Sequence, residues 1–107
     1  MGADLLKGIR VLDLGRVLAA PYCATLMADL QADVVKVEAV DGDDARHLGP
    51  FRDGESVYFA QLNRGKRSIA LNLKDDEEKA VLYRLVAEAD VVVENFRPGV
   101  TARLGID

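Results

Sequence analysis

The stretch that decides the fold runs from Ile9 to Glu38 and reads IRVLDLGRVLAAPYCATLMADLQADVVKVE. It opens with a short, nearly continuous apolar run, which is typical of a strand covered on both faces. Gly15 ends that run, and Pro21 stands where the first turn of a helix tolerates a missing N–H. Apolar and small residues then recur at helical spacing until a valine-rich run begins at Val34. A parallel pair of strands joined by a helical crossover is the simplest structure with this pattern.

The rest of the chain extends this unit. Residues 39–54 are polar and rich in turn-forming residues, and a loop of that length is more often functional than idle. Asp75 and Glu78 have the spacing of a capping box. The elements expected after the loop are one or two helical turns over 56–62, a strand over 68–73, a helix from 75, a strand over 91–93 and a last helix starting over 100–104. This order predicts an α/β fold, a Rossmann-like parallel sheet with flanking helices that is the N-terminal portion of a larger fold.

Length and composition narrow the class of protein. A chain of 107 residues has room for one domain, and its 50% hydrophobic content favours a packed globule over disorder. The formal net charge of −4 argues against general nucleic-acid binding, which needs a basic face. The sequence shows neither a secretory apolar core nor an apolar run near the ~20 residues that span a bilayer. We therefore expect a cytoplasmic protein that binds neither nucleic acid nor membrane.

Three polar or reactive residues are interpreted as having no catalytic or metal-binding role. The single cysteine, Cys23, excludes an internal disulfide, makes a cysteine-based zinc site implausible, and is predicted to be a buried thiol inside the first helix. No metal is expected. Asp13 lies inside a strand that is predicted to be buried, so its expected role is to bond a neighbouring turn. His47, the only histidine, lies in the polar loop and is interpreted as a surface residue rather than as a general base.

A ligand of such a sheet is expected beyond the carboxyl ends of the strands, because open α/β sheets bind ligands there. Four segments converge at that edge: 15–20, the loop after Glu38, 72–75 and 95–98. The first of them lacks the three glycines that a dinucleotide site needs, so NAD and FAD are disfavoured, and the sequence has no Walker pattern. Val17, Leu18 and Ala19 instead offer an apolar surface that suits an adenine face or an acyl-pantetheine arm.

Basic residues near the other turns could serve a ligand with several phosphates, because guanidinium and ammonium groups form charge-assisted bonds with phosphate oxygens. For each of them the alternative is ordinary solvated surface charge. Lys74 and Arg97 are the better candidates, because each comes directly after an expected strand. The full set is Arg46, Arg64, Lys66, Arg67, Lys74, Arg97 and Arg103.

Five segments of the chain resemble a known family. They are LKGIRVLDL from Leu6, APYC from Ala20, ADVVKVE from Ala32, NRGKRSIALNLK from Asn63 and ADVVVENFRPG from Ala89. In this order and spacing they resemble the N-terminal part of the family III CoA-transferases, of the formyl-CoA and carnitine-CoA transferase type. These transferases share a superfamily with α-methylacyl-CoA racemase. The resemblance covers almost the whole chain, and NRGKRS and VENFRPG are its most specific segments.

The resemblance implies a fold and a reaction. The family's large domain is Rossmann-like, its homodimers interlock like two chain links, and coenzyme A lies at the strand ends. The reaction moves CoA from an acyl-CoA donor to a carboxylate acceptor through an aspartate nucleophile, a mixed anhydride and an aspartyl-CoA thioester. That aspartate is expected beyond this chain's last residue, so no catalytic residue is assigned within it. Residues 1–107 would then be the CoA-binding segment of a longer chain, inactive by itself.

The resemblance also assigns binding residues by position. Val17, Leu18 and Ala19 would line the adenine and pantetheine side, and Arg103 would pair with the phosphates. Lys74 would reach a phosphate, and Phe96 would offer a stacking or packing surface. The CoA-binding set implied is Val17, Leu18, Ala19, Leu71, Asn72, Leu73, Lys74, Asn95, Phe96, Arg97 and Arg103. One position departs from the family, because several members carry arginine where this chain has Ala39, which leaves one adenine or ribose contact open.

Two alternatives stay open from the sequence. An acyl-CoA racemase of the same superfamily would use a histidine and aspartate pair, again downstream, to exchange the proton α to the thioester. A short chain that binds CoA or only dimerises, without turnover, is the other. The sequence does not indicate the acyl donor or acceptor. Apolar surface that the rest of the parent polypeptide would cover predicts self-association of the isolated chain.

Overall fold

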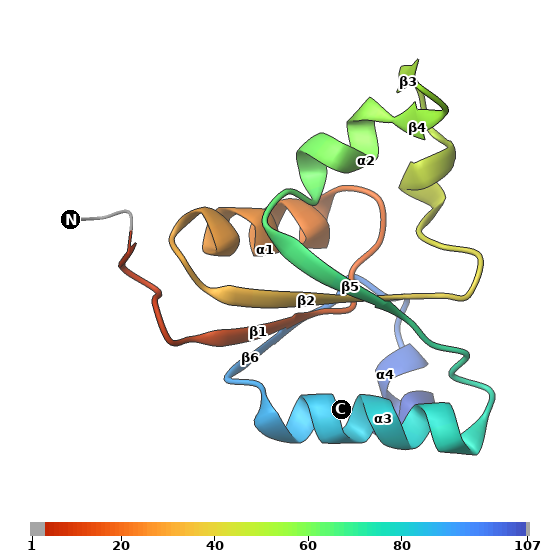
Figure 1. Ribbon diagram of the computed structural model, residues 1–107. Coiled ribbons are helices and arrows are strands. Elements are labelled where there is room, and N and C mark those ends of the chain that lie inside the picture. Colours follow the sequence, from red (N-terminus) through yellow and green to blue (C-terminus); the bar gives the residue numbers. More distant parts are fainter. Residues whose placement is uncertain (1–3, 107) are drawn as a thin grey trace.

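A computed structural model describes residues 4–106 and shows a parallel sheet between two layers of helices (Figure 1). The sheet contains β1 (Arg10–Asp13), β2 (Asp33–Glu38), β5 (Lys66–Ala70) and β6 (Val91–Val93), in the order β5-β2-β1-β6. All three pairings are parallel, so the carboxyl ends of the strands share one edge of the sheet. The predicted α/β class and the parallel sheet are confirmed.

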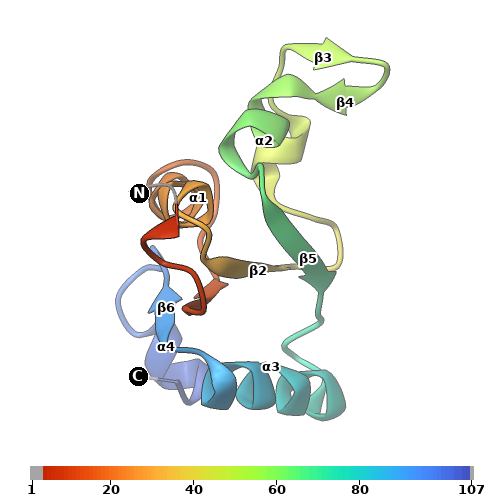
Figure 2. The same cartoon turned by 60° about the vertical axis from the view of Figure 1, so that its left-hand side comes forward.

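Helices cover both faces of this sheet. The helices α1 (Ala19–Asp29) and α2 (Val57–Leu62) lie on one side, and α3 (Asp76–Glu88) and α4 (Val100–Leu104) lie on the other (Figures 1 and 2). The expected crossover helix is α1, and the expected helices at 56–62, from 75 and over 100–104 are α2, α3 and α4.

The side-chain alternation of β1 divides the core in two. Leu12 and Leu14 pack into a cluster that contains Leu82 of α3, whereas Val11 packs into a cluster with Ala24 of α1. Because successive strand residues point to opposite faces, Asp13 shares the α1 side with Val11. A charged side chain is thereby placed in the layer between the sheet and α1.

The segment from 39 to 54 has more structure than a polar loop was expected to have. It contains the 3-10 helix η2 (Asp44–His47) and the hairpin strand β3 (Phe51–Arg52), which pairs antiparallel with β4 (Glu55–Ser56). The hairpin projects from the body of the molecule (Figure 2). Ser56 then begins α2, because its hydroxyl accepts the Phe59 N–H at 3.1 Å.

Three local expectations require correction. The strand expected over 68–73 runs from Lys66 to Ala70, because its partner β2 ends at Glu38, which pairs with Ala70. Asp75 caps α3 through the N–H groups of Glu77 and Glu78, but the Glu78 carboxylate accepts the N–H of Asn72 and not that of Asp75.

Cys23, predicted to be buried, is exposed. The buried face of α1 comprises Ala20, Pro21, Ala24 and Thr25. At 100° per residue Cys23 falls on the other side of the helix, beside the exposed Tyr22 and Leu26. The prediction relied on the apolar neighbours of Cys23 in sequence. Because α1 is mostly apolar on both faces, these neighbours do not indicate which face is buried.

Candidate functional site

A cavity of about 740 Å³ opens at the carboxyl edge of the sheet. This volume lies in the range of small-molecule sites. Leu14 and Val37 come from the ends of β1 and β2, and Phe96 from the segment after β6. The full lining is Leu14, Gly15, Arg16, Val37, Glu38, Ala39, Val40, Asp41, Asp43, Leu71, Asn72, Leu73, Lys74, Phe96, Val100 and Leu104.

The cavity joins an apolar part to a charged part. Leu14, Val37, Leu71, Leu73 and Phe96 also belong to the core cluster beneath α3, so their side chains are held in place by packing. Two cations, Arg16 and Lys74, are among the lining residues and are exposed to solvent. The arrangement can hold a ligand that has both an apolar, planar part and anionic groups.

A buried ionic cluster lies on the α1 side of the same strand ends. It consists of Asp13, Lys36, Asp43 and Lys66, whose side chains are at most 1% exposed. Lys36 Nζ lies 2.9 Å from Asp43 Oδ2, and Lys66 Nζ lies 2.7 Å from Asp13 Oδ2. Two carboxylates and two ammonium groups balance the charge, which burial requires.

Strand register explains why these charges meet. Asp13 of β1 pairs directly with Lys36 of β2, so both side chains leave the sheet on the α1 face. Burial lowers the pKa of Lys66, and its bond to Asp13 acts in the opposite direction. Burial alone would raise the pKa of Asp43, but the N–H of Ala45 and the Lys36 ammonium hold this pKa below its ordinary value. The ion pairs of Asp13 with Lys36 and with Lys66 join β1, β2 and β5.

Glu38 closes β2 with a carboxylate whose oxygens are fully engaged. They accept from Arg46 Nε at 2.7 Å, from Arg46 Nη2 at 2.8 Å, from Ser68 Oγ at 2.6 Å and from the Asp43 N–H at 2.9 Å. The Arg46 guanidinium, with help from Ser68 and the Asp43 N–H, lowers the pKa of Glu38 to about 2 against the cost of burial. An acid at this position binds ribose in dinucleotide folds, but here the internal donors occupy it.

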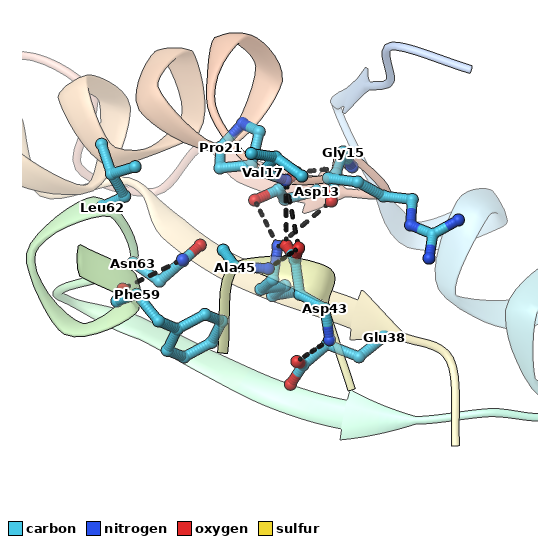
Figure 3. Close-up of polar contacts among 12 residues, drawn as sticks. Asp13, Gly15, Val17, Pro21, Glu38, Asp43, Ala45, Phe59, Leu62 and Asn63 are labelled. Atoms are coloured by element: carbon cyan, nitrogen blue, oxygen red, sulfur yellow. Dashed lines mark hydrogen bonds and ion pairs between the residues drawn. The ribbon is translucent and has the colours of Figure 1, made fainter. Parts of the chain in front are cut away.

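Asp43 and Asn95 both bond the backbone of the turn that follows β1. The Asp43 carboxylate accepts the Val17 N–H, and Figure 3 shows it between the Gly15–Val17 turn and Ala45. The Asn95 amide accepts the Arg16 N–H at 2.9 Å and donates to the Arg16 carbonyl at 3.0 Å. Segments that follow β1, β2 and β6 are thus joined around the cavity.

The residues expected to bind CoA fall into two groups. Those that line the cavity are Leu71, Asn72, Leu73, Lys74 and Phe96. Those outside its lining are Val17, Leu18, Ala19, Asn95, Arg97 and Arg103. Arg97 and Arg103 are exposed, and within residues 4–106 neither side chain forms an ion pair, so both stay available to an anion.

Some cations expected near a phosphate have internal partners instead. Arg46 binds Glu38, Arg64 binds Asp29 and Arg67 binds Asp33. Lys66 is buried against Asp13, so surface charge is the wrong description for it. Asp13 bonds the neighbouring turn as predicted, since Oδ1 accepts the Gly15 N–H at 2.8 Å. His47 ends η2 and is exposed.

Sequence reasoning missed several lining residues, above all Arg16 and Asp43. A usable signal was present, because Asp13 and Lys36 interrupt two apolar strands at positions that face the same layer. A buried charge in a strand requires a partner, and that requirement points to the loop that carries Asp43. Within the described residues, 4–106, no group of three or more metal-ligating side chains occurs. No helix in this range is long and apolar enough to cross a membrane.

The model of CoA-transferase family III matches residues 6–107 of this chain. The chain belongs to CoA-transferase family III. The resemblance seen in the five sequence segments is therefore confirmed, and the fold agrees with it.

Relatives of this family III chain are CoA-transferases. It is 48% identical over 101 residues to an acetyl-CoA:oxalate CoA-transferase of Acetobacter aceti, covering 94% of this chain and 26% of that protein. It is 54% identical over 104 residues to a succinyl-CoA:mesaconate CoA-transferase of Haloarcula marismortui, covering 92% of this chain and 26% of that protein.

Solved structures of similar proteins agree. A CAIB/BAIF family protein from Brucella suis superposes with a TM-score of 0.90 at 44% identity, over 96% of this family III chain and 29% of that one. The chain thus spans about a quarter of the length of the curated relatives it matches.

Proposed function

We propose that this chain is the CoA-binding part of a CoA-transferase that moves CoA from an acyl-CoA donor to a carboxylate acceptor. The observation that supports this most directly is the cavity at the carboxyl edge of a parallel sheet in a family III chain. Ligands of open α/β sheets bind at that edge. Residues 1–107 would form the N-terminal segment of the parent enzyme.

The donor set fits the chemistry of CoA. Apolar side chains of Leu71, Leu73 and Phe96 suit the adenine face and the pantetheine arm. Lys74 at the cavity suits phosphate oxygens, and Arg16 can exchange its exposed partner Asp44, 3.5 Å away, for a phosphate oxygen. The exposed Arg97 and Arg103 can extend this positive field outside the cavity. Asn72 and Asn95 supply amide groups nearby, and the turn over Val17, Leu18 and Ala19 would guide the pantetheine arm along the edge of the sheet.

Binding and catalysis are assigned to different parts of the parent polypeptide. The chain binds and orients the nucleotide, and the nucleophilic aspartate is assigned to the remainder of the parent polypeptide. The aspartate would take the acyl group from the donor as a mixed anhydride and release CoA. The released thiolate would attack the aspartyl carbonyl of this anhydride, which expels the donor's carboxylate and leaves an aspartyl-CoA thioester. The acceptor carboxylate would attack that thioester to form a second anhydride and free thiolate, and the thiolate would attack the acceptor's acyl carbon, which yields the new CoA thioester and restores the aspartate. Asp13 and Asp43 are not assigned that role, because both are buried in ion pairs.

The parent enzyme is proposed to be a cytoplasmic homodimer. Transferase chemistry is favoured over the racemase of the same superfamily, because the relatives described above are CoA-transferases. A racemase, or a module that binds CoA without turnover, would share the same nucleotide site and differ only in the catalytic part.

Calorimetry with CoA and a transfer assay on this chain test the proposal together. We expect CoA binding with no transfer of CoA between succinyl-CoA and a carboxylate acceptor. Transfer by this chain alone would show that the nucleophile lies within it and would overturn the division of labour. Absence of CoA binding to a folded chain would overturn the nucleotide site.

A further inference from the structure

The turn after β1 contains a strained residue. Among residues 4–106, the residues other than glycine with positive φ are Val17, Gln31 and Asp53. Val17, at φ 66°, is the one with a β-branched side chain, for which this region is a genuine outlier. The Leu18 N–H donates to the Arg16 carbonyl at 3.0 Å across Val17, which is the strained, positive-φ form of the γ-turn.

Such a conformation persists only where its surroundings enforce it. The Val17 N–H points at Asp43 and donates to its Oδ1 at 3.1 Å and its Oδ2 at 3.3 Å. On the preceding residue, Asn95 holds both the N–H and the carbonyl of Arg16. The turn is therefore fixed on two sides by side chains that follow β2 and β6.

Asp43 is itself fixed by its buried neighbours. Its Oδ1 accepts the Ala45 N–H at 3.0 Å, and its Oδ2 lies 2.9 Å from Lys36 Nζ. Lys36 also donates to the Gly15 carbonyl at 3.1 Å, so the same ammonium touches both the acid and the turn that the acid holds. The Asp43 N–H bonds Glu38 at 2.9 Å. These contacts hold the Asp43 carboxylate in place within hydrogen-bond distance of the Val17 N–H.

The held turn forms a wall of the cavity. Gly15, Arg16 and Asp43 all line it, so a change at Val17 would shift the Arg16 side chain and the Gly15 backbone relative to the ligand. We propose that Asp43 is a positioning residue of the nucleotide site: its bond to the Val17 N–H keeps the strained turn in the shape that presents Arg16 to the bound ligand. This inference rests on the proposed CoA site.

The test compares two double variants, Lys36→Met with Asp43→Asn and Lys36→Met with Asp43→Ala. Both remove one cation and one anion, which avoids leaving an unpaired buried charge. Both also lose the bond from Lys36 to Gly15, so that loss cancels in the comparison. They differ in the side-chain oxygen, which asparagine retains and alanine lacks. Asp53→Asn, in the exposed turn of the hairpin, is the matched control for loss of a carboxylate.

Two measurements are made on each folded variant. The first is hydrogen exchange of the Val17 amide, with the Asp33 amide as an internal reference because it bonds the Ile9 carbonyl at the other end of the sheet. The second is CoA affinity by calorimetry. We expect the alanine pair to lose about tenfold in both Val17 protection and CoA affinity relative to the asparagine pair. Asp53→Asn should match the unsubstituted chain.

The outcomes separate this inference from the proposed function. Equal Val17 protection in the two double variants shows that Asp43 does not hold the turn and overturns the inference. Lower protection with equal CoA affinity also overturns it, because the turn would then not matter to the ligand. If the unsubstituted chain does not bind CoA, the proposed function fails, and the Val17 exchange still decides whether Asp43 holds the turn.

Discussion

The Asn95 side chain bonds both backbone groups of Arg16, accepting its N–H at 2.9 Å and donating to its carbonyl at 3.0 Å. The two residues are 79 positions apart in the chain. This two-way bond ties the segment after β6 to the turn after β1, and both segments flank the cavity. An amide is the side chain that offers an acceptor and a donor at this spacing.

Replacing Asn95 should loosen this junction. Asn95→Ala loses both bonds and is expected to lower the free energy of unfolding by about 1–3 kcal/mol, because each intramolecular hydrogen bond contributes ~0.5–1.5 kcal/mol net. Asn95→Asp keeps the acceptor for the Arg16 N–H but sets a second acceptor against the Arg16 carbonyl, so it should also destabilise the chain. Urea unfolding measures both. An alanine variant as stable as the unsubstituted chain would show that the junction contributes nothing.

The pair of Glu38 and Arg46 predicts how stability depends on pH. The pKa of Glu38 is about 2 in the folded chain, below the ordinary 4.5. Its contribution to stability is therefore complete above pH 4.5 and is lost as the pH falls toward 2. Glu38→Gln should reduce the pH dependence of the free energy of unfolding between pH 4.5 and 2. Urea titrations at successive pH values measure this dependence. Glu77→Gln, at an exposed helix position, is the control, and an equal reduction there would contradict the assignment to Glu38.

Lys74 is expected to contribute electrostatic affinity for CoA. It lines the cavity, is exposed and forms no ion pair within residues 4–106. Lys74→Ala should weaken CoA binding about tenfold and reduce its dependence on salt, because one charge-assisted bond to phosphate is lost. Lys79→Ala, on α3 and outside the lining, is the matched control. Calorimetry at two salt concentrations measures the CoA affinity of both variants. Equal effects of Lys74→Ala and Lys79→Ala would refute a specific contact between Lys74 and a phosphate.

Gly15 is needed for close packing of the turn against α1. A Cβ at this position would lie 2.3 Å from Ala20 Cβ and 2.9 Å from Pro21 Cδ. Gly15→Ala should destabilise the chain by about 1–3 kcal/mol, the usual cost of overpacking. Gly54→Asn is the control, because nothing lies within 4 Å of its Cβ position and asparagine tolerates its φ of +80°. Thermal unfolding of the two variants checks this, and an unchanged midpoint for Gly15→Ala would contradict it.

The exposed side of α1 supports the expected self-association. Leu18, Tyr22 and Leu26 recur at four-residue spacing and are 45–52% exposed, so they form an apolar stripe along the helix. Leu26→Lys should shift the isolated chain toward monomer in light scattering at matched concentrations. A chain that is already monomeric before substitution would contradict the prediction of self-association.

Apolar runs and capping residues in the sequence predicted most of the strands and helices. Continuous apolar runs around Leu12 and Val92 predicted parallel strands, and Asp75 marked the start of α3. The candidate site was readable in part, because the segments after the strands include Leu71–Lys74 and Phe96, which line the cavity. Local pattern did not show that Cys23 faces solvent or that Lys66 is buried, since each depends on what another segment covers.

The sequence by itself determined the succession along the chain of the four parallel strands and their flanking helices, the α/β class and the family. These depend on side-chain periodicity, turn residues and recognisable segments, all of which are local along the chain. Only the tertiary structure decided which charges meet. Lys66 is 53 positions from Asp13, and Asp43 is 26 positions from Val17. Their contacts depend on strand register and on the path of the loop after β2, and burial of these charged groups requires that they be paired.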